Sequence, residues 1–342
     1  MINIPHLFPI FVPQGKSRTR YRVGYIDREG SLVIDPIFNQ GTRFVEGMAS
    51  VQVKGGRWGV IDTNGNFVIQ PELWNWCRFR DGVAPLATKE GKWGFIDKTG
   101  NFVVRPSYES VGPFENGRAL VRIGEGHEAR FGFIDRTGAE AIPLTFHSAR
   151  HFSEGLAAVK VANLWGYIAP SGVFQITPRF DGTGKAKRYP DIRAGAFVDG
   201  LAPVWVDQDH YRFIDANGRF AFESGFDDAN TLSEGLAVIK QGHRFGYIDK
   251  DGQIAIECRF TLARDFSDGL AKVEVEESRS GFPARAGFID KKGNIAIPPK
   301  FHAASGFVNG LSLVSTEDSI GYINGSGEFV WQGPFVDYGV LF

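Results

Sequence analysis

Acidic side chains are the most regularly spaced chemical groups in this sequence. An aspartate that follows an isoleucine stands three positions before a glycine at seven places, namely Asp27, Asp62, Asp97, Asp135, Asp215, Asp249 and Asp290. Each position offers one carboxylate without a second acid at a fixed offset, whereas calcium prefers about six to eight oxygen ligands. An aspartate can also accept a hydrogen bond from the backbone N–H two residues on, while the glycine adopts positive φ. The spacing therefore predicts capped turns and not calcium sites.

A second set of acids stands two positions after an apolar residue, in most copies phenylalanine, and precedes a glycine. Its members include Glu46, Glu154, Glu234 and Asp268. Because these acids recur in nearly every copy of the pattern, they do not have the character of a unique general acid and base. We expect them to hold backbone N–H groups of turns or to pair with Lys and Arg. The sequence therefore predicts a protein that is not an enzyme and has no cofactor.

Histidine and cysteine offer little further chemistry. His147 and His151 are four residues apart, but their segment has the pattern of a loop and a strand and lacks a third zinc ligand. Cys77 and Cys258 are too few and too far apart to indicate a disulfide framework. Since Cys77 lies beside two tryptophans, we expect a buried thiol.

Two basic segments are the candidate binding sites. Lys185 follows Thr-Gly, but the phosphate-loop pattern lacks its first glycine and has alanine after the lysine. Function is often carried by loops on a rigid scaffold, so this loop is the best candidate for a specific contact, although a solvated loop is the simpler interpretation. Alternating arginines near the N-terminus suggest an anion-binding stripe or, more simply, a charged edge strand. The candidate binding residues are Lys185, Lys187, Arg188, Tyr189, Arg193, Arg18, Arg20 and Arg22.

Overall charge and the N-terminal residues restrict the partners and the location. The chain has 38 Lys and Arg against 39 Asp and Glu, so no global field attracts nucleic acid or an anionic membrane. The first residues lack a basic stretch followed by a long apolar run, and no run approaches the length of a membrane-spanning helix. We therefore expect a cytoplasmic protein without a membrane partner. The overall charge also disfavours nucleic acid as a partner.

The aspartate turns belong to a repeat. Nine segments follow the pattern glycine, aromatic, Ile, Asp, two variable residues and glycine, with replacements at single positions. They begin at Gly24, Gly59, Gly94, Gly132, Gly166, Arg212, Gly246, Gly287 and Gly321. The sixth copy has Arg212 in place of its first glycine, and the fifth has Ala169 in place of its aspartate.

Each copy predicts three short strands. The aromatic-Ile-Asp residues end one strand, Asp-x-x-Gly forms a hairpin turn, and an alternating apolar stretch returns. After a proline, Phe-x-acid-Gly makes a second turn, anchored by its phenylalanine, and Leu-Ala-x-Val forms the third strand. An isolated hairpin is only marginally stable, so neighbouring units must stack to bury their side chains.

These motifs resemble the WG repeat of bacterial proteins. The Trp-Gly that gives the repeat its name stands at Trp58-Gly59, Trp93-Gly94 and Trp165-Gly166, and Phe replaces Trp before Gly132 and Gly246. The resemblance covers residues 21–342. It implies a repeat protein that serves as an interaction module, and it brings no catalytic residues. We expect the motif aromatics to pack in the core, and Trp205 and Trp331, which lie off this register, to be weaker candidates for exposed contacts.

The repeat predicts an all-β array of about nine three-stranded units. We expect a capping strand within residues 1–20 and the array over residues 21–342. An open superhelical solenoid is favoured, because nine units of three strands fit poorly with a propeller of about four to eight four-stranded blades. A closed, propeller-like arrangement, in which the N-terminal strand completes the last unit, is the alternative.

Three functions agree with such an array. The first is a non-catalytic scaffold that binds a protein partner or another ligand. The second is a carbohydrate or small-ligand binding protein, or an enzyme, with its site in a groove or channel. The third is nucleic-acid binding through the basic segments, with an affinity that falls steeply with salt.

Overall fold

The chain folds almost entirely into short antiparallel strands, which confirms the all-β prediction. The computed structural model describes residues 6–15, 20–181, 194–206, 210–275 and 285–335. The described part of the chain contains no helix that is long and apolar enough to span a membrane.

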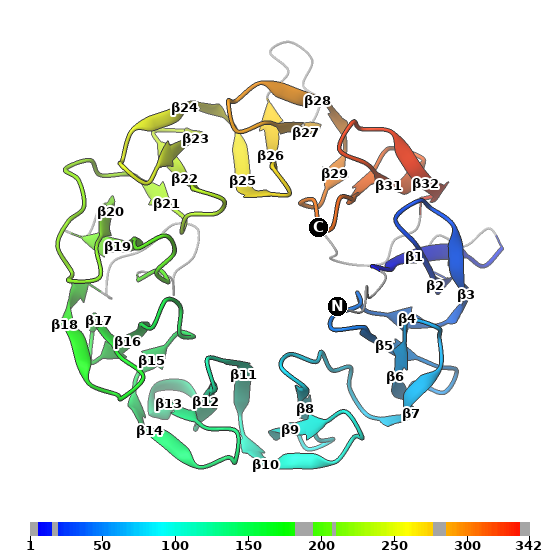
Figure 1. The fold of residues 1–342 in the computed structure, drawn as a ribbon, viewed down its shortest axis with the longest axis horizontal. Helices are drawn as coiled ribbons and strands as arrows, with labels where there is room; N and C mark the ends of the chain where they lie inside the picture. Colours follow the sequence, from blue (N-terminus) through cyan, green and yellow to red (C-terminus); the bar gives the residue numbers. More distant parts are fainter. Residues whose placement is uncertain (1–5, 16–19, 182–193, 207–209, 276–284, 336–342) are drawn as a thin grey trace, which may run out of the picture. The chain divides into compact units, whose positions relative to one another are not determined.

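The elements are as follows in chain order (Figure 1). The strands are β1 (Phe8–Pro13), β2 (Tyr21–Ile26), β3 (Leu32–Phe38), β4 (Gln40–Gly41), β5 (Met48–Gln52), β6 (Trp58–Asp62), β7 (Phe67–Leu73), β8 (Val83–Ala87), β9 (Trp93–Asp97), β10 (Phe102–Tyr108), β11 (Ser110–Glu115), β12 (Arg118–Ile123), β13 (Arg130–Ile134), β14 (Glu140–Phe146), β15 (Ser148–Ala149) and β16 (Ala157–Val161). They continue with β17 (Leu164–Ile168), β18 (Phe174–Asp181), β19 (Ala202–Val206), β20 (His210–Ile214), β21 (Asp228–Ala229), β22 (Leu236–Gln241), β23 (Arg244–Asp249), β24 (Ile254–Phe260), β25 (Leu262–Ser267), β26 (Leu270–Val275), β27 (Arg285–Ile289), β28 (Ile295–Phe301), β29 (Ala303–Ala304), β30 (Ser312–Ser315), β31 (Ser319–Ile323) and β32 (Phe329–Pro334). One 3-10 turn, η1, covers Gly126–Glu128.

These strands form nine small sheets within the described residues, one for each copy of the repeat. Six sheets have four strands in sequential order, β1–β3 and β8–β10 have three, and β19–β20 has two. The predicted three-stranded unit is therefore wrong. The Leu-Ala-x-Val strand pairs with the motif strand that follows it, as β22 pairs with β23, so it belongs to the following sheet and does not complete the preceding one.

The two turns of the repeat have the predicted chemistry. In the β23–β24 hairpin, the Asp249 carboxylate accepts hydrogen bonds from the N–H groups of Asp251 and Gln253, both at 2.9 Å. Gly252 has a φ of 79°, as the glycine of a bulged three-residue loop requires. In the acid-Gly turn before the seventh copy, where Leu232 replaces the phenylalanine, Glu234 and Gly235 have φ values of 53° and 84°, which is the pattern of a type I′ hairpin turn.

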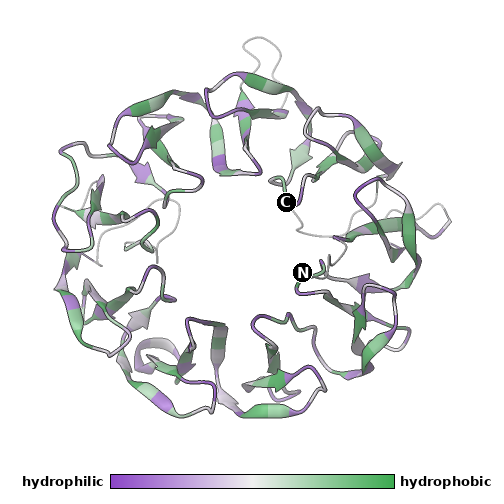
Figure 2. Cartoon of the chain, in the orientation of Figure 1, coloured by the Kyte–Doolittle hydropathy of each residue, from purple (hydrophilic) through white to green (hydrophobic). Residues whose placement is uncertain are grey.

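The hydrophobic core lies on both faces of the two middle strands of a sheet. In β23, Tyr247 packs with residues of the following sheet, such as Phe266, whereas Ile248 packs with Phe213 of the preceding sheet. The last strand of the sheet alternates as predicted, with Ile254 exposed and Ile256 buried in β24. Figure 2 shows the hydrophobic residues gathered on the strands. Stability therefore depends on the stacking of neighbouring sheets.

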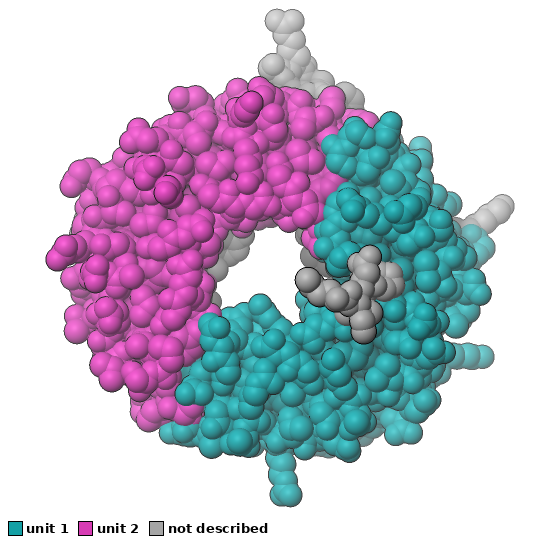
Figure 3. Space-filling model, viewed as in Figure 1, with its two compact units in different colours: residues 1–125, 133–140, 309–342 teal, residues 126–132, 141–308 magenta. Residues whose placement is uncertain are grey.

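The structure divides into two compact units (Figure 3). Unit 1 comprises residues 1–125, 133–140 and 309–342, and unit 2 comprises residues 126–132 and 141–308. Unit 1 thus contains both the first and the last repeats of the chain.

Contacts between these first and last repeats overturn the open superhelical solenoid. The Tyr322 hydroxyl donates a hydrogen bond to the backbone oxygen of Pro9 at 3.0 Å, and the rings of Phe8 and Tyr322 make an edge contact at 5.4 Å. β1 lies beside β32 in unit 1 (Figure 1). An open array keeps its ends apart because each repeat touches only its neighbours. The contact is the one that the closed, propeller-like alternative requires, although β1 pairs with β2 of the first sheet and does not complete the last.

Motif tyrosines connect successive sheets by a recurring hydrogen bond. The hydroxyls of Tyr25, Tyr167 and Tyr247 donate to backbone oxygens of the next repeat at 3.0, 2.9 and 2.8 Å. Burial raises the pKa of all three phenols far above its usual value, so they remain neutral donors.

Replacing Tyr247 by phenylalanine should leave the backbone oxygen of Arg264 without this donor. We expect the free energy of unfolding to fall by about 1–2 kcal/mol, measured by urea denaturation. Tyr167→Phe removes the equivalent bond to Gly195 and should show a similar loss. An unchanged denaturation midpoint in both variants would show that the bond does not tie the sheets together.

Candidate functional site

The repeated acids are engaged in structural contacts. The hydroxyl of Thr99 and the N–H groups of its turn lower the pKa of the Asp97 carboxyl. The Glu154 carboxylate accepts hydrogen bonds from the N–H groups of Asp199 and Gly200 in the next turn, at 2.8 and 2.9 Å. Glu46 binds the equivalent N–H groups of a later turn in the same way. The predicted role of these acids as holders of turn N–H groups is therefore confirmed.

Histidine and cysteine also have structural partners. His147 accepts a hydrogen bond from the N–H of Ala162 through Nδ1 at 3.1 Å. Cys77 is buried, as predicted, and burial raises the pKa of its thiol to about 11. Among the residues that the structure describes, no group of three His, Cys, Asp or Glu side chains could hold a metal ion.

The predicted basic binding residues fall mostly outside the described residues. Lys185, Lys187, Arg188, Tyr189, Arg193 and Arg18 all belong to the segments 16–19 and 182–193, which the structure does not describe. Arg22 lies in β2 and donates a hydrogen bond to Oδ1 of Asn39. Because β2 pairs with strands on both sides, its arginine does not lie on an edge strand, and that part of the prediction is wrong. Arg20 lies just before β2 and is exposed.

The repeat itself is interrupted at the sixth copy. In regular copies the motif glycine lies against the returning strand, and a Cβ at Gly246 would stand 2.5 Å from the Ile256 oxygen. A side chain at this position is therefore incompatible with a regular returning strand. The sixth copy has Arg212 there, and its sheet consists of β19 and β20 alone. The returning segment contacts β20 only through isolated bridges, which join Ile214 to Phe220 and Tyr211 to Phe226.

The Arg212 side chain occupies space near the missing strand. Its guanidinium carbon lies 3.8 Å from the centroid of the Phe220 ring, and Nη2 donates to the backbone oxygen of Phe222 at 3.1 Å. The stacked guanidinium thus helps to fix a phenyl ring that is 46% exposed. A substitution that looks like a simple loss of the motif therefore reshapes the local surface.

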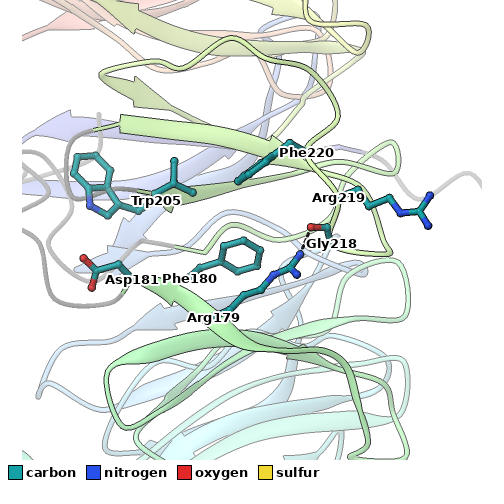
Figure 4. A pocket seen from close by; sticks show the side chains of 8 residues that line it. Arg179, Phe180, Asp181, Trp205, Gly218, Arg219 and Phe220 are labelled. Carbon is teal, nitrogen blue, oxygen red and sulfur yellow. Dashed lines mark hydrogen bonds between the residues drawn. The ribbon is translucent and has the colours of Figure 1, made fainter.

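A pocket of about 710 Å³ lies beside this interruption, in unit 2 (Figure 4). Its lining residues are Arg179, Phe180, Asp181, Trp205, Val206, Gly218, Arg219 and Phe220. Figure 4 shows the rings of Phe180 and Phe220 on two sides of the pocket, with Trp205 toward one end and Gly218 toward the other. The pocket therefore combines aromatic faces with two guanidinium groups and one carboxylate.

The polar groups of the lining differ in their availability. Arg179 donates to the backbone oxygen of Gly218 and lies over the Phe180 ring at 5.1 Å, so its position is fixed. Arg219 is exposed. The Trp205 side chain is 95% buried, and its Nε1 has no hydrogen-bond partner among the described residues. An unpaired buried N–H costs roughly 1–3 kcal/mol, so the pocket wall contains an unused donor.

Comparison with protein-family models identifies the family of this repeat. The model described as "WG containing repeat" matches residues 24–57, 58–93, 93–126, 131–165, 211–242, 245–277 and 287–318. The chain belongs to the WG-repeat family. Residues 166–210 are not matched, and this interval of the WG-repeat array contains β18, β19 and five of the eight residues that line the pocket.

Solved structures resemble this WG-repeat protein only distantly. The computationally designed Ika8 protein is 12% identical, with a TM-score of 0.49 over 80% of this chain and 92% of that one. BamB from Moraxella catarrhalis is 12% identical, with a TM-score of 0.39 over 94% of both chains. Sqt1 from Saccharomyces cerevisiae is 9% identical, with a TM-score of 0.42 over 85% of this chain and 94% of that one. At these values the similarity does not bear on function, and no curated protein matches the sequence significantly.

The WG motif residues themselves are part of the core. Trp58 and Trp165 are 8% and 3% exposed, which confirms for these two the prediction that the motif aromatics pack inside, whereas Trp93 is half-buried. Trp205 was a candidate for an exposed contact, but it is buried at the pocket wall. Sequence reasoning missed the pocket, although Arg212 at a glycine position and the long spacing between the fifth and sixth copies both marked this region.

Proposed function

We propose that this WG-repeat protein is a non-catalytic binding module, and that its pocket in unit 2 receives an apolar group that carries an anionic substituent. The observation that carries the proposal is the position of the pocket at the interruption of the repeat. Regular copies use their aromatics and acids for packing and turns, whereas here aromatic rings and guanidinium groups line an open volume. Binding sites are typically apolar concave surfaces with a few placed polar groups.

The lining chemistry favours this ligand class. Phe180 and Phe220 offer ring faces, Arg219 offers an exposed cation, and the indole N–H of Trp205 offers a donor. An anion with an aromatic or aliphatic body places that body against the phenyl rings and its charge near Arg219. Either a side chain near the carboxyl end of a partner protein or a small organic acid has that chemistry.

An enzymatic alternative would need at least two titratable groups placed to act together. The described lining of the pocket contributes a single carboxylate, Asp181. The phenols with strongly raised pKa values, such as that of Tyr167, are buried between sheets and hydrogen-bonded there. These features support binding rather than catalysis.

Titration with N-acetyl-phenylalanine tests the pocket, and the corresponding amide is the matched probe without the negative charge. We expect the acid to bind more tightly than the amide. Arg219→Gln should weaken binding of the acid by about fivefold, the loss of one charge-assisted bond of roughly 1 kcal/mol. Phe220→Ala should weaken both probes, because it removes a ring face. Isothermal titration calorimetry can measure all four combinations.

Two results would contradict the proposal. One is an affinity for the acid that is equal in the wild type and Phe220→Ala. The other is equal affinity for acid and amide, because the arginines would then have no role. Arg105→Gln, an exposed arginine on β10 in unit 1, is a matched control that should change neither probe.

A further inference from the structure

A second interruption of the repeat lies in unit 1, between β7 and β8. In four other sheets this position holds a two-residue first strand of small or polar residues, such as Gln40–Gly41 in β4 and Ala303–Ala304 in β29. Here the residues are Trp74, Asn75 and Trp76, which are outside any strand, and the β8–β10 sheet has three strands. The two indole side chains are 49% and 50% exposed.

The segment that carries the tryptophans is held firmly to its neighbours. The buried hydroxyl of Ser50 donates to the Cys77 backbone oxygen at 2.6 Å and accepts from the Cys77 N–H at 3.0 Å. Asn75 donates to the backbone oxygen of Ala87 at 3.5 Å, and Phe79 is 2% exposed. The exposed indoles are therefore preorganised, which lowers the entropic cost of binding a partner.

Basic side chains surround the two indoles. The Arg57 guanidinium carbon lies 3.3 Å from the Trp74 ring centroid, and Nη1 of Arg57 donates to the backbone oxygen of Glu72 at 3.2 Å. Lys89 Nζ lies 5.2 Å from the same ring, and the Arg78 guanidinium carbon lies 5.9 Å from the Trp76 ring.

These cations are available to a partner. None of the three forms an ion pair within the described part of the chain. Glu72 and Glu90 are the neighbouring acids in sequence. Together with the three cations they give a net charge of +1. We call Arg57, Trp74, Trp76, Arg78 and Lys89 the Trp74–Trp76 surface.

We propose that the Trp74–Trp76 surface binds an acidic segment of a partner protein that also carries an aromatic or aliphatic side chain. Tryptophan and arginine are the residue types most enriched at the energetic centres of protein interfaces. A guanidinium held flat against Trp74 presents a fixed fork of donors, which matches a carboxylate better than a diffuse charge does.

A lipid surface fits these observations less well. Interfacial anchoring to a membrane needs apolar side chains that project into the acyl region. Half of each indole is covered here, and cations lie over both rings. The inference extends the proposed binding role to a partner of defined chemistry, but it does not depend on the pocket in unit 2.

A fluorescein-labelled random copolymer of glutamate and tyrosine is a defined probe, and a lysine–tyrosine copolymer is its charge-reversed control. In a titration measured by fluorescence anisotropy, we expect the acidic copolymer to bind the 342-residue chain. We expect the basic copolymer not to bind. The double variant Trp74→Ala/Trp76→Ala should weaken binding at least tenfold, which corresponds to about 1.4 kcal/mol. Arg57→Gln or Arg78→Gln should weaken it about threefold each and flatten its salt dependence.

Matched variants keep the test decisive. Ile37→Ala removes a side chain that is 63% exposed in β3 and should leave binding unchanged. The double tryptophan variant should keep the wild-type affinity for N-acetyl-phenylalanine, so failure of the pocket and failure of this surface can be told apart. If the double tryptophan variant does not fold, as judged by circular dichroism, Arg78→Gln alone still tests the surface.

Three outcomes would overturn the proposal. The first is equal binding of the acidic and basic copolymers. The second is binding that survives in every variant of the surface. The third is stronger binding to phosphatidylglycerol vesicles than to the acidic copolymer, lost in the same variants, which would assign the surface to lipid.

Discussion

Deletion of residues 1–13, which removes β1, is expected to lower the free energy of unfolding by roughly 6 kcal/mol or more. Four apolar side chains of this segment, Leu7, Phe8, Ile10 and Phe11, are at most 7% exposed, and each contributes about 1.5–3 kcal/mol by burial. The deletion also exposes the paired edge of β2 and leaves the Tyr322 hydroxyl without its acceptor. Urea denaturation followed by circular dichroism measures the loss.

Two comparisons show whether this loss comes from contact between the first and last repeats. Phe8→Ala removes only the ring that touches Tyr322, and should cost about 3 kcal/mol. A synthetic peptide of residues 6–15, added to the deleted protein, should restore stability in proportion to its concentration. If the deleted protein had the same denaturation midpoint as the wild type, the stabilising contact of β1 with the last repeat would be refuted.

Replacement of Gly246 by valine is expected to destabilise the protein by about 3 kcal/mol. The new Cβ would stand 2.5 Å from the Ile256 oxygen and 2.8 Å from the Cys258 nitrogen, so β23 and β24 would have to separate. The same steric argument explains why the sixth copy, with Arg212 at this position, lacks a regular returning strand. Denaturation in urea measures the effect.

Gly306 provides the control for this substitution. A Cβ at Gly306 meets nothing within 4 Å, and Gly306→Ala should change stability by less than about 0.5 kcal/mol. If Gly246→Val were as stable as the wild type, the returning strand would not require a glycine at this position. Arg212 would then not explain the interruption of the sixth copy.

Local features of the fold follow well from the sequence. Asp249 and Gly252 determine their turn through bonds within five residues, so the turn can be predicted from residue types alone. The same holds for the Glu234-Gly235 turn and for the alternation in β24. Because these signals are short-range, the boundaries of the hairpins are also set locally.

Long-range features do not follow in the same way. Leu-Ala-x-Val strands such as β22 lie between two hairpins in sequence, and nothing local indicates with which one they pair. The contact of Tyr322 with Pro9 depends on the accumulated geometry of all the repeats between them. The Trp74–Trp76 surface and the pocket both arise where the pattern fails, so rules derived from the regular copies cannot describe them.

Both candidate sites thus lie where a returning or first strand is absent from its sheet. Regular copies use their aromatic rings to hold neighbouring sheets together, as Tyr247 and Phe266 do at 5.0 Å. At the interruptions, comparable rings are exposed beside arginines: Phe220 beside Arg212, and Trp74 beside Arg57. This common arrangement is the basis for assigning binding to these two places.

The indole N–H signals of the seven tryptophans provide the most direct test of this assignment. In a two-dimensional NMR spectrum of the ¹⁵N-labelled protein, N-acetyl-phenylalanine should shift the signal of Trp205, and the glutamate–tyrosine copolymer should shift those of Trp74 and Trp76. The core signals of Trp58 and Trp165 should remain in place under both titrations. Shifts confined to those core signals, or no shifts at all, would contradict the claim that the interruptions of the repeat are the binding sites.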